Sequence, residues 1–145
     1  MIHGDVETVR SLYDAYAAMD IGGIEGLLAE GYVMHVSGSH PLSGDYTTKE
    51  AVWGYLGKVA ETSGGKGGFD VHTITSDGQG HAVALVTGTI RDHVRPVVHV
   101  FHVRDGKITE FWDAYLDAAA EDQFWVTALA GCGSPIAARV NELDA

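Results

Sequence analysis

The sequence has little of what several classes of protein require. Among its 145 residues there is one cysteine, Cys132, which cannot form an internal disulfide bond. No apolar run is long enough to cross a membrane, and no secretory signal follows Met1. We therefore expect a cytoplasmic protein that makes no contact with membranes.

Basic residues are also scarce. Lysine and arginine together number 9, against 20 aspartates and glutamates, so that the formal net charge is -11. A chain this acidic repels nucleic-acid backbones and anionic membrane surfaces. We expect no nucleic-acid partner and no highly anionic substrate.

Recognised ligand and phosphate motifs are missing too. The chain has 8 histidines, but none of them falls in a known metal-binding spacing. His99 and His102 are three residues apart in a predicted strand, so their side chains point to opposite faces. The glycine-rich segment 63–68 lacks the phosphate-loop pattern. We therefore expect neither a metal nor a cofactor.

The first half of the chain predicts helices. Apolar residues recur there at helical spacing, and Thr47 with Glu50 forms a capping-box signature before the third repeat. Glycines weaken the second repeat. These patterns predict helices over 6–16, 21–28 and 51–59, with a strand over 32–36.

The second half predicts strands. Segments rich in Val, Ile, Thr and aromatic residues alternate with turn signals, which is typical of an antiparallel meander. Asp117 is placed to cap a closing helix that continues through Leu129. Helices followed by strands predict an α+β fold, and the length predicts a single domain over 1–145. The predicted strands cover 69–75, 81–91, 95–104 and 107–116.

The last hairpin contains ionisable residues among apolar ones. Asp105-Gly106 is a strong hairpin signal, and His99 and Asp113 lie on either side of it. Burying unpaired ionisable groups is costly, so we expect this pair to be partnered or to face a cavity. Histidine exchanges protons near neutral pH, and a nearby carboxylate can orient it or complement it. The two residues are therefore candidate catalytic groups.

Two turn geometries are open for this hairpin. A bulge at Gly106 would pair Val103 with Lys107 and put His99 and Asp113 on one face. A two-residue turn would pair Arg104 with Lys107, and without a further bulge the pair would diverge. The residue pattern does not decide between them.

Three segments carry a family resemblance. The segments are residues 27–30 (LLAE), 35–44 (HVSGSHPLSG) and 98–108 (VHVFHVRDGKI). Together with the order of the predicted helices and strands, they resemble the nuclear transport factor 2-like superfamily. Within it, the resemblance is to the SnoaL-like and ketosteroid-isomerase-related proteins. The resemblance covers about residues 5–126, leaving 127–145 as a C-terminal extension. It implies a cone-shaped curved antiparallel sheet packed on the N-terminal helices, as in cystatin-like folds. It also favours the bulge at Gly106.

The resemblance implies roles for several residues. His35 is at the position of the general base of ketosteroid isomerases, and His99 is at the position of their oxyanion-donating acid. Tyr16 or Tyr13 would be the second donor. SnoaL-like cyclases use a His and an Asp on the last two strands, which matches His99 and Asp113. We therefore take His99, Asp113 and His35 as candidate catalytic residues.

Five further residues are candidates for substrate binding. Arg91 could bind a substrate oxygen, or simply neutralise Asp113. Trp53 could line the pocket mouth, or pack in the core, and the same alternatives hold for Tyr16. Aromatic side chains of the last hairpin complete the set, Phe101 and Phe111.

The function predicted from this resemblance is that of a cofactor-free cyclase or isomerase. It would act on an apolar small molecule, a small or polycyclic carbonyl compound, by proton transfer through His and Asp. Alternatives are a noncatalytic small-molecule-binding module with the same pocket, and an epoxide hydrolase or dehydratase of the same superfamily. We expect a homodimer that associates through the convex face of the sheet.

Overall fold

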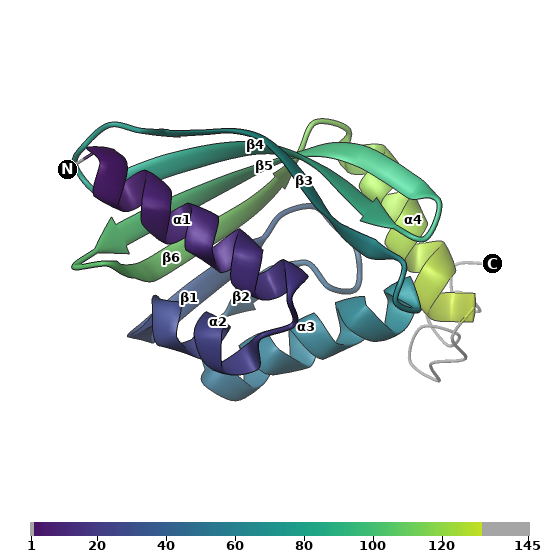
Figure 1. Ribbon diagram of the computed structural model, residues 1–145. Coiled ribbons are helices and arrows are strands. Elements are labelled where there is room, and N and C mark those ends of the chain that lie inside the picture. The colour runs from purple at the N-terminus through teal and green to yellow at the C-terminus, as the bar shows by residue number, and fades with distance from the viewer. Residues whose placement is uncertain (1, 132–145) are drawn as a thin grey trace.

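The structure, a computed structural model that describes residues 2–131, contains one curved sheet (Figure 1). Its six strands lie in the order β2-β1-β6-β5-β4-β3. The last four form the predicted antiparallel meander. The first long strand joins it by pairing in parallel with β6, which the sequence did not indicate. The strands are β1 (Leu28–Val36), β2 (Gly44–Tyr46), β3 (Gly67–Ser76), β4 (His81–Ile90), β5 (His93–Arg104) and β6 (Lys107–Tyr115).

Four helices accompany the sheet: α1 (Ile2–Ala17), α2 (Ile21–Leu27), α3 (Lys49–Ser63) and α4 (Ala118–Gly131). In Figure 1, α1 crosses one face of the sheet, while α4 lies at the end of the molecule remote from the N-terminus. No helix within residues 2–131 combines the length and apolar character that crossing a bilayer requires. The α+β class predicted from the sequence is confirmed.

Helix caps follow local side-chain chemistry. The N-cap of α3 is Thr48, whose hydroxyl accepts from the amide of Ala51 at 3.1 Å. The predicted capping box starting at Thr47 is therefore wrong by one residue. The prediction for the closing helix is confirmed, because the carboxylate of Asp117 accepts from the amide of Ala120 at 3.0 Å.

The core lies between the helices and one face of the sheet, which we call the inner face. Val9 of α1 packs against alternate residues of β4, β5 and β6, such as Ala84 and Phe101. Val52 of α3 packs against Met34 of β1 and its neighbours. The opposite side, the outer face, carries the other residues of each strand because side chains alternate along a strand.

The predicted C-terminal extension, 127–145, is described only in part. Helix α4 continues into it as far as Gly131. The remaining residues, 132–145, including Cys132 and the predicted helical tail, lie outside the described residues.

The last hairpin has the two-residue turn at Asp105-Gly106 and, separately, a bulge further along β6. Asp105 and Gly106 have φ values of 52° and 73°, and Arg104 pairs with Lys107, so the turn is the two-residue type rather than the predicted bulge at Gly106. The extra residue is Thr109, because Val103 pairs with Ile108 while His102 already pairs with Glu110. This bulge shifts the register by one residue and puts Asp113, not Trp112, opposite His99.

Candidate functional site

His99 and Asp113 face each other on the inner face of the sheet. They are directly paired across β5 and β6, and their residues are 2% and 7% exposed. The next inward positions on the same strands are Phe101 and Phe111, which also pair with each other. The bulge at Thr109 therefore places a buried histidine and a buried carboxylate together in an apolar setting.

A cavity of about 100 Å³ opens beside this pair. Helices α1, α2 and α3 and the inner face of the sheet enclose it. Apart from the phenols of tyrosines, His99 and Asp113 are the only titratable groups among the described residues of its wall. Ligand sites in proteins usually measure roughly 300–1,000 Å³, so this cavity, as packed, fits a single small ring. The other lining residues are Leu12, Tyr13, Tyr16, Ile24, Leu28, Tyr32, Met34, Val52, Tyr55, Leu56, Val59, Phe69, Phe101 and Phe111.

The two oxygens of Asp113 have different surroundings. Oδ2 accepts hydrogen bonds from the hydroxyls of Tyr115 at 3.1 Å and Tyr55 at 3.5 Å. Oδ1 lies 3.2 Å from Nε2 of His99, close enough for an ion pair. The approach is not aligned for a hydrogen bond, and Oδ1 is buried without a hydrogen-bond partner. Asp113 thus holds one satisfied oxygen and one that is free to accept a proton.

Tyr13 fixes the orientation of His99. Its hydroxyl oxygen lies 2.5 Å from Nδ1 of His99, and the two rings are stacked with centroids 5.9 Å apart. Nδ1 is assigned as the acceptor of this bond, because a phenol that keeps its proton donates it. The ring hydrogen then lies on Nε2, which is 3.2 Å from Oδ1 of Asp113 but not aligned with it for a hydrogen bond. Tyr13 thus leaves Nε2–H available as a donor beside Asp113.

The tyrosines around Asp113 remain protonated donors. Burial, and then the charge of Asp113, raise the pKa of Tyr13, Tyr55 and Tyr115 above the usual range. These hydroxyls therefore supply hydrogen bonds without adding negative charge. A single carboxylate is left as the base in the cavity wall.

Six of the residues named from the sequence line one cavity: His99, Asp113, Tyr13, Tyr16, Phe101 and Phe111. Of the two tyrosines named as the second donor, Tyr13 is the one whose hydroxyl contacts His99. For the residues of the hairpin, the prediction and the structure agree because side chains alternate between the two faces along each strand.

His35 lies elsewhere, on the outer face. It pairs with Trp112 across β1 and β6, whereas its neighbours Met34 and Val36 point inward. Its ring nitrogens donate to Asp45 at 2.7 Å and Glu110 at 2.5 Å. The expectation that His35 joins His99 in one cavity is therefore wrong, because strand alternation sends it to the opposite side of the sheet.

Arg91 and Trp53 also lie outside the cavity wall. Arg91 is exposed in the turn between β4 and β5, where its φ is 59°. It neither reaches the cavity nor pairs with Asp113. Trp53 is half-buried on α3, but Val52 and Tyr55 take the side of the helix that faces the cavity. Both predicted substrate contacts are absent from this arrangement.

Sequence reasoning missed several inward-facing polar residues. Tyr115 lies two residues after Asp113 on the same strand, so period-two alternation could have found it. Arg95 lies four residues before His99 and could have been found in the same way. Glu121 of α4, 1% exposed, binds Arg95 through two hydrogen bonds, and neither residue carried a motif.

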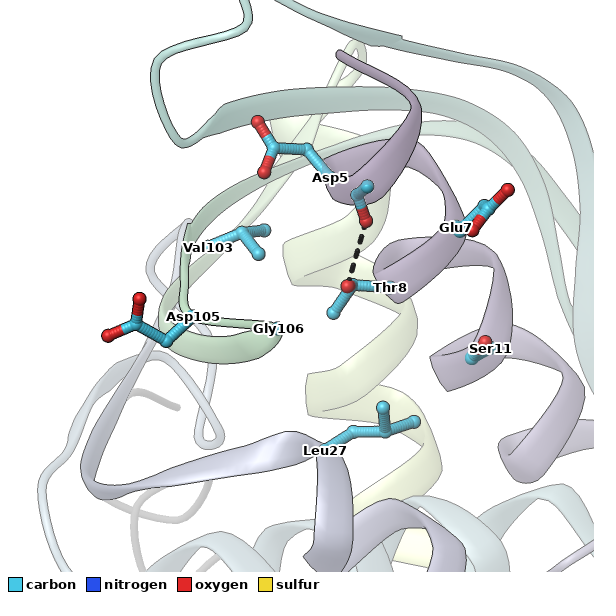
Figure 2. Close-up of a pocket in the computed structure, with 9 residues that line it drawn as sticks. Asp5, Glu7, Thr8, Ser11, Leu27, Val103, Asp105 and Gly106 are labelled. Carbon is cyan, nitrogen blue, oxygen red and sulfur yellow. Dashed lines mark hydrogen bonds between the residues drawn. The ribbon is translucent and has the colours of Figure 1, made fainter. Parts of the chain in front are cut away.

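A second hollow lies between the start of α1 and the turn joining β5 to β6. Figure 2 shows that its walls carry the carboxylates of Asp5, Glu7 and Asp105. Its volume of about 530 Å³ is larger, but it is open to solvent. Asp5 already accepts hydrogen bonds from Ser76 and Gly80. No histidine is among the described residues that line it, and Glu7 and Asp105 are exposed to solvent, so we place the candidate chemistry at His99 and Asp113.

Metal binding was tested on the same geometry. Within the part of the chain that the structure describes, no group of three or more His, Cys, Asp or Glu side chains is arranged to hold a metal ion.

Comparisons with known proteins place this chain in a family. The SnoaL-like domain family matches residues 9–111. The uncharacterized protein Rv0034 of Mycobacterium tuberculosis is 25% identical over 127 residues, which cover 83% of this chain and 95% of that protein.

Solved structures share the fold. Bal32a, from a soil-derived mobile gene cassette, superposes with a TM-score of 0.78 at 24% identity, covering 85% of this chain and 97% of that one. A protein from Kribbella flavida DSM 17836 assigned as a ketosteroid isomerase has a TM-score of 0.66 at 19% identity, with 81% of each chain covered. A protein from Xanthomonas campestris with a cystatin-like fold has a TM-score of 0.72 at 22% identity, covering 83% of this chain and 97% of that one. Together with the likeness to a nuclear transport factor 2-like protein from Burkholderia pseudomallei, it confirms the predicted nuclear transport factor 2-like, cystatin-like fold. Because the family match covers more than half of the chain, the protein belongs to the SnoaL-like domain family.

Proposed function

We propose that this protein is a cofactor-free enzyme that transfers a proton at the carbon next to a carbonyl group of a small apolar compound. The result would be isomerisation or cyclisation. The observation that carries the proposal is the buried oxygen Oδ1 of Asp113, a residue of the cavity wall, which has no hydrogen-bond partner among the described residues. A buried acceptor left unpaired is costly, and such groups often serve catalysis.

Asp113 would act as the base. Its Oδ1 takes a proton from the carbon, and the electrons of the C–H bond form the double bond of an enolate. Tyr55 and Tyr115 hold the other oxygen, so the carboxylate keeps one orientation. The apolar lining of the cavity keeps water away from the base and from the bound substrate.

His99 would stabilise the enolate oxygen. Its Nε2 lies 3.2 Å from Oδ1 of Asp113, so a carbonyl bound beside that carboxylate would be within reach of Nε2–H. This N–H donates a hydrogen bond to the negative oxygen, and Tyr13 keeps the ring in that tautomer. Return of the proton from Asp113 to a different carbon gives isomerisation. Attack of the enolate carbon on a second carbonyl of the same molecule gives cyclisation, and the alkoxide so formed takes the proton back from Asp113.

The alternative is a noncatalytic module that only binds a small molecule, and the exchange experiment below distinguishes it from an enzyme. His99 is in contact with four aromatic rings, those of Tyr13, Phe69, Phe101 and Phe111, as a purely structural histidine would be. The geometry supports an epoxide hydrolase less well. Limonene-type epoxide hydrolases carry an Arg-x-Asp motif, and the resemblance puts Thr89 and Arg91 at its two positions in this chain. Neither residue is among those lining the cavity.

Deuterium exchange into a simple ketone tests the proposal. We expect the protein to accelerate exchange at the carbons beside the carbonyl of 4-phenyl-2-butanone in D₂O, followed by proton NMR. Asp113→Asn should lower the enzymatic exchange rate by roughly 10² or more with little change in melting temperature. Glu110→Gln, which changes a carboxylate on the outer face, is the matched control and should exchange at the wild-type rate.

Two results would contradict the proposal. One is an exchange rate no faster than that of buffer with the wild-type protein. The other is undiminished exchange in Asp113→Asn. Binding of the ketone without exchange would instead support the noncatalytic module.

A further inference from the structure

A second polar group lies on the inner face of the sheet, two side-chain rows away from His99. Arg95 precedes His99 by four residues on β5, so both side chains point inward. Its Nε and Nη2 donate to the carboxylate of Glu121 at 2.9 and 3.1 Å. Its other terminal nitrogen, Nη1, is buried and has no hydrogen-bond partner among the residues that the structure describes. A ligand oxygen placed there would satisfy a donor that the fold leaves unpaired.

This nitrogen lies next to Phe69, a residue of the cavity wall, although Arg95 is not itself among the lining residues. Arg95 pairs with Gly88 across β4 and β5, and a Cβ atom on Gly88 would lie 2.5 Å from Nη1. The same point is 3.3 Å from Cε1 of Phe69. The Phe69 ring lines the cavity, with its centroid 4.9 Å from that of the His99 ring. The width of one phenyl ring therefore separates the guanidinium from the candidate catalytic pair.

The charge around Arg95 restricts the ligand. Glu121 is 1% exposed and cancels the charge of the guanidinium, while it also accepts from His93 and Trp125. A carboxylate on the ligand would meet the buried charge of Glu121 and would bring an uncompensated charge of its own. A keto, hydroxyl or phenol oxygen accepts from Nη1–H without adding charge. An uncharged oxygen therefore fits this position best.

We propose that Arg95 binds a second, uncharged oxygen of the substrate, at the end remote from the carbonyl that lies beside His99 and Asp113. The assignment of that first carbonyl rests on the proposed function. The substrate class is then a largely apolar molecule with an oxygen at each end. Phe69 separates the two ends of the site and turns aside to admit the ligand, since the cavity as packed holds one small ring.

A matched pair of ketones tests this second contact. 4-Phenyl-2-butanone and 4-(4-hydroxyphenyl)-2-butanone differ only in a phenol oxygen at the end remote from the carbonyl. We expect the wild-type protein to bind the phenol about tenfold more tightly, as measured by isothermal titration calorimetry, because the new hydrogen bond comes from a charged donor.

Two variants separate Arg95 from general effects. Gly88→Ala places a methyl group against Nη1 while leaving the Arg95–Glu121 charge pair in the protein, and it should remove the preference. Arg95→Met combined with Glu121→Gln removes the guanidinium without leaving a buried unpaired charge, and should do the same. Gly54→Ala is the matched control, because a Cβ there has no atom within 4 Å, and it should keep the preference.

The outcomes distinguish this proposal from the proposed function. Equal affinity of the two ketones for the wild-type protein, or binding of neither, overturns the role of Arg95. A preference that survives in both Gly88→Ala and the double variant also overturns it. A tenfold tighter binding of the phenol without deuterium exchange would support the Arg95 contact and would contradict only the proton-transfer chemistry.

Discussion

Histidines and carboxylates face each other on both sides of the same sheet, and the two sides differ in how completely their polar atoms are paired. On the outer face, His35 donates to Asp45 and Glu110 at 2.7 and 2.5 Å. His102 lies 3.5 Å from the same Glu110, and His81 lies next to the His102 ring. On the inner face, one oxygen of Asp113 has no hydrogen-bond partner.

This comparison shows that residue type alone does not identify the site. Water reaches the outer row, and none of the described side-chain atoms that are buried without a partner belongs to it. Such a row behaves as a set of surface ion pairs, each contributing little to stability. The inner pair is buried and incompletely hydrogen-bonded. A buried polar atom without a partner costs free energy, so we interpret this pair as functional. Burial together with a missing partner is what marks the inner pair.

The largest expected effect is on stability, from removing the buried carboxylate of Glu121. Glu121→Ala should lower the free energy of unfolding by about 3–5 kcal/mol, because Arg95 is left as an uncompensated buried charge. Glu110→Ala on the outer face should cost no more than about 1 kcal/mol. Urea unfolding at neutral pH measures both. Equal losses in the two variants would remove the energetic distinction between the faces.

An intermediate effect is expected from the hydroxyl that orients His99. Tyr13→Phe should slow deuterium exchange into 4-phenyl-2-butanone by about tenfold, because the histidine loses its donor at Nδ1 while the base Asp113 remains. Tyr46→Phe is the control, since its hydroxyl donates to the backbone oxygen of Leu42 outside the cavity wall. A wild-type rate in Tyr13→Phe would show that the inner histidine needs no orienting partner.

The smallest effect is a pH dependence on the outer face. Hydrogen bonds to Asp45 and then to Glu110 raise the pKa of His35, so the folded protein holds this proton more tightly than the unfolded chain does. Its contribution is complete below the unfolded pKa of about 6.5 and is lost as the pH rises through the raised, folded value.

The stability difference between wild type and His35→Gln should therefore be larger at pH 5.5 than at pH 9, and below about 1 kcal/mol at its greatest. Chemical denaturation at the two pH values gives this difference. A larger difference at pH 9 would mean that His35 is held as the neutral ring. Exchange at Asp113 should be unaffected by the substitution.

Much of the fold could be predicted from the sequence because it depends on local patterns. Helical spacing from Val6 onward predicted α1, and runs of β-branched residues predicted the meander from 69 to 116. The family resemblance and the importance of His99 and Asp113 also came from the sequence. The parallel pairing of β1 with β6 did not, because it joins segments separated by most of the chain.

What only the tertiary structure decided is which face each polar side chain occupies. Asp105-Gly106 forms the two-residue turn, which by itself would have separated His99 from Asp113. The bulge at Thr109 restores their pairing, and the same alternation sends His35 to the outer face. A register shift of one residue reverses the direction of every later side chain in a strand. The position of such a register shift depends on cross-strand packing. The sequence alone therefore identified His99 and Asp113 as candidates, and the three-dimensional structure showed that they form one site.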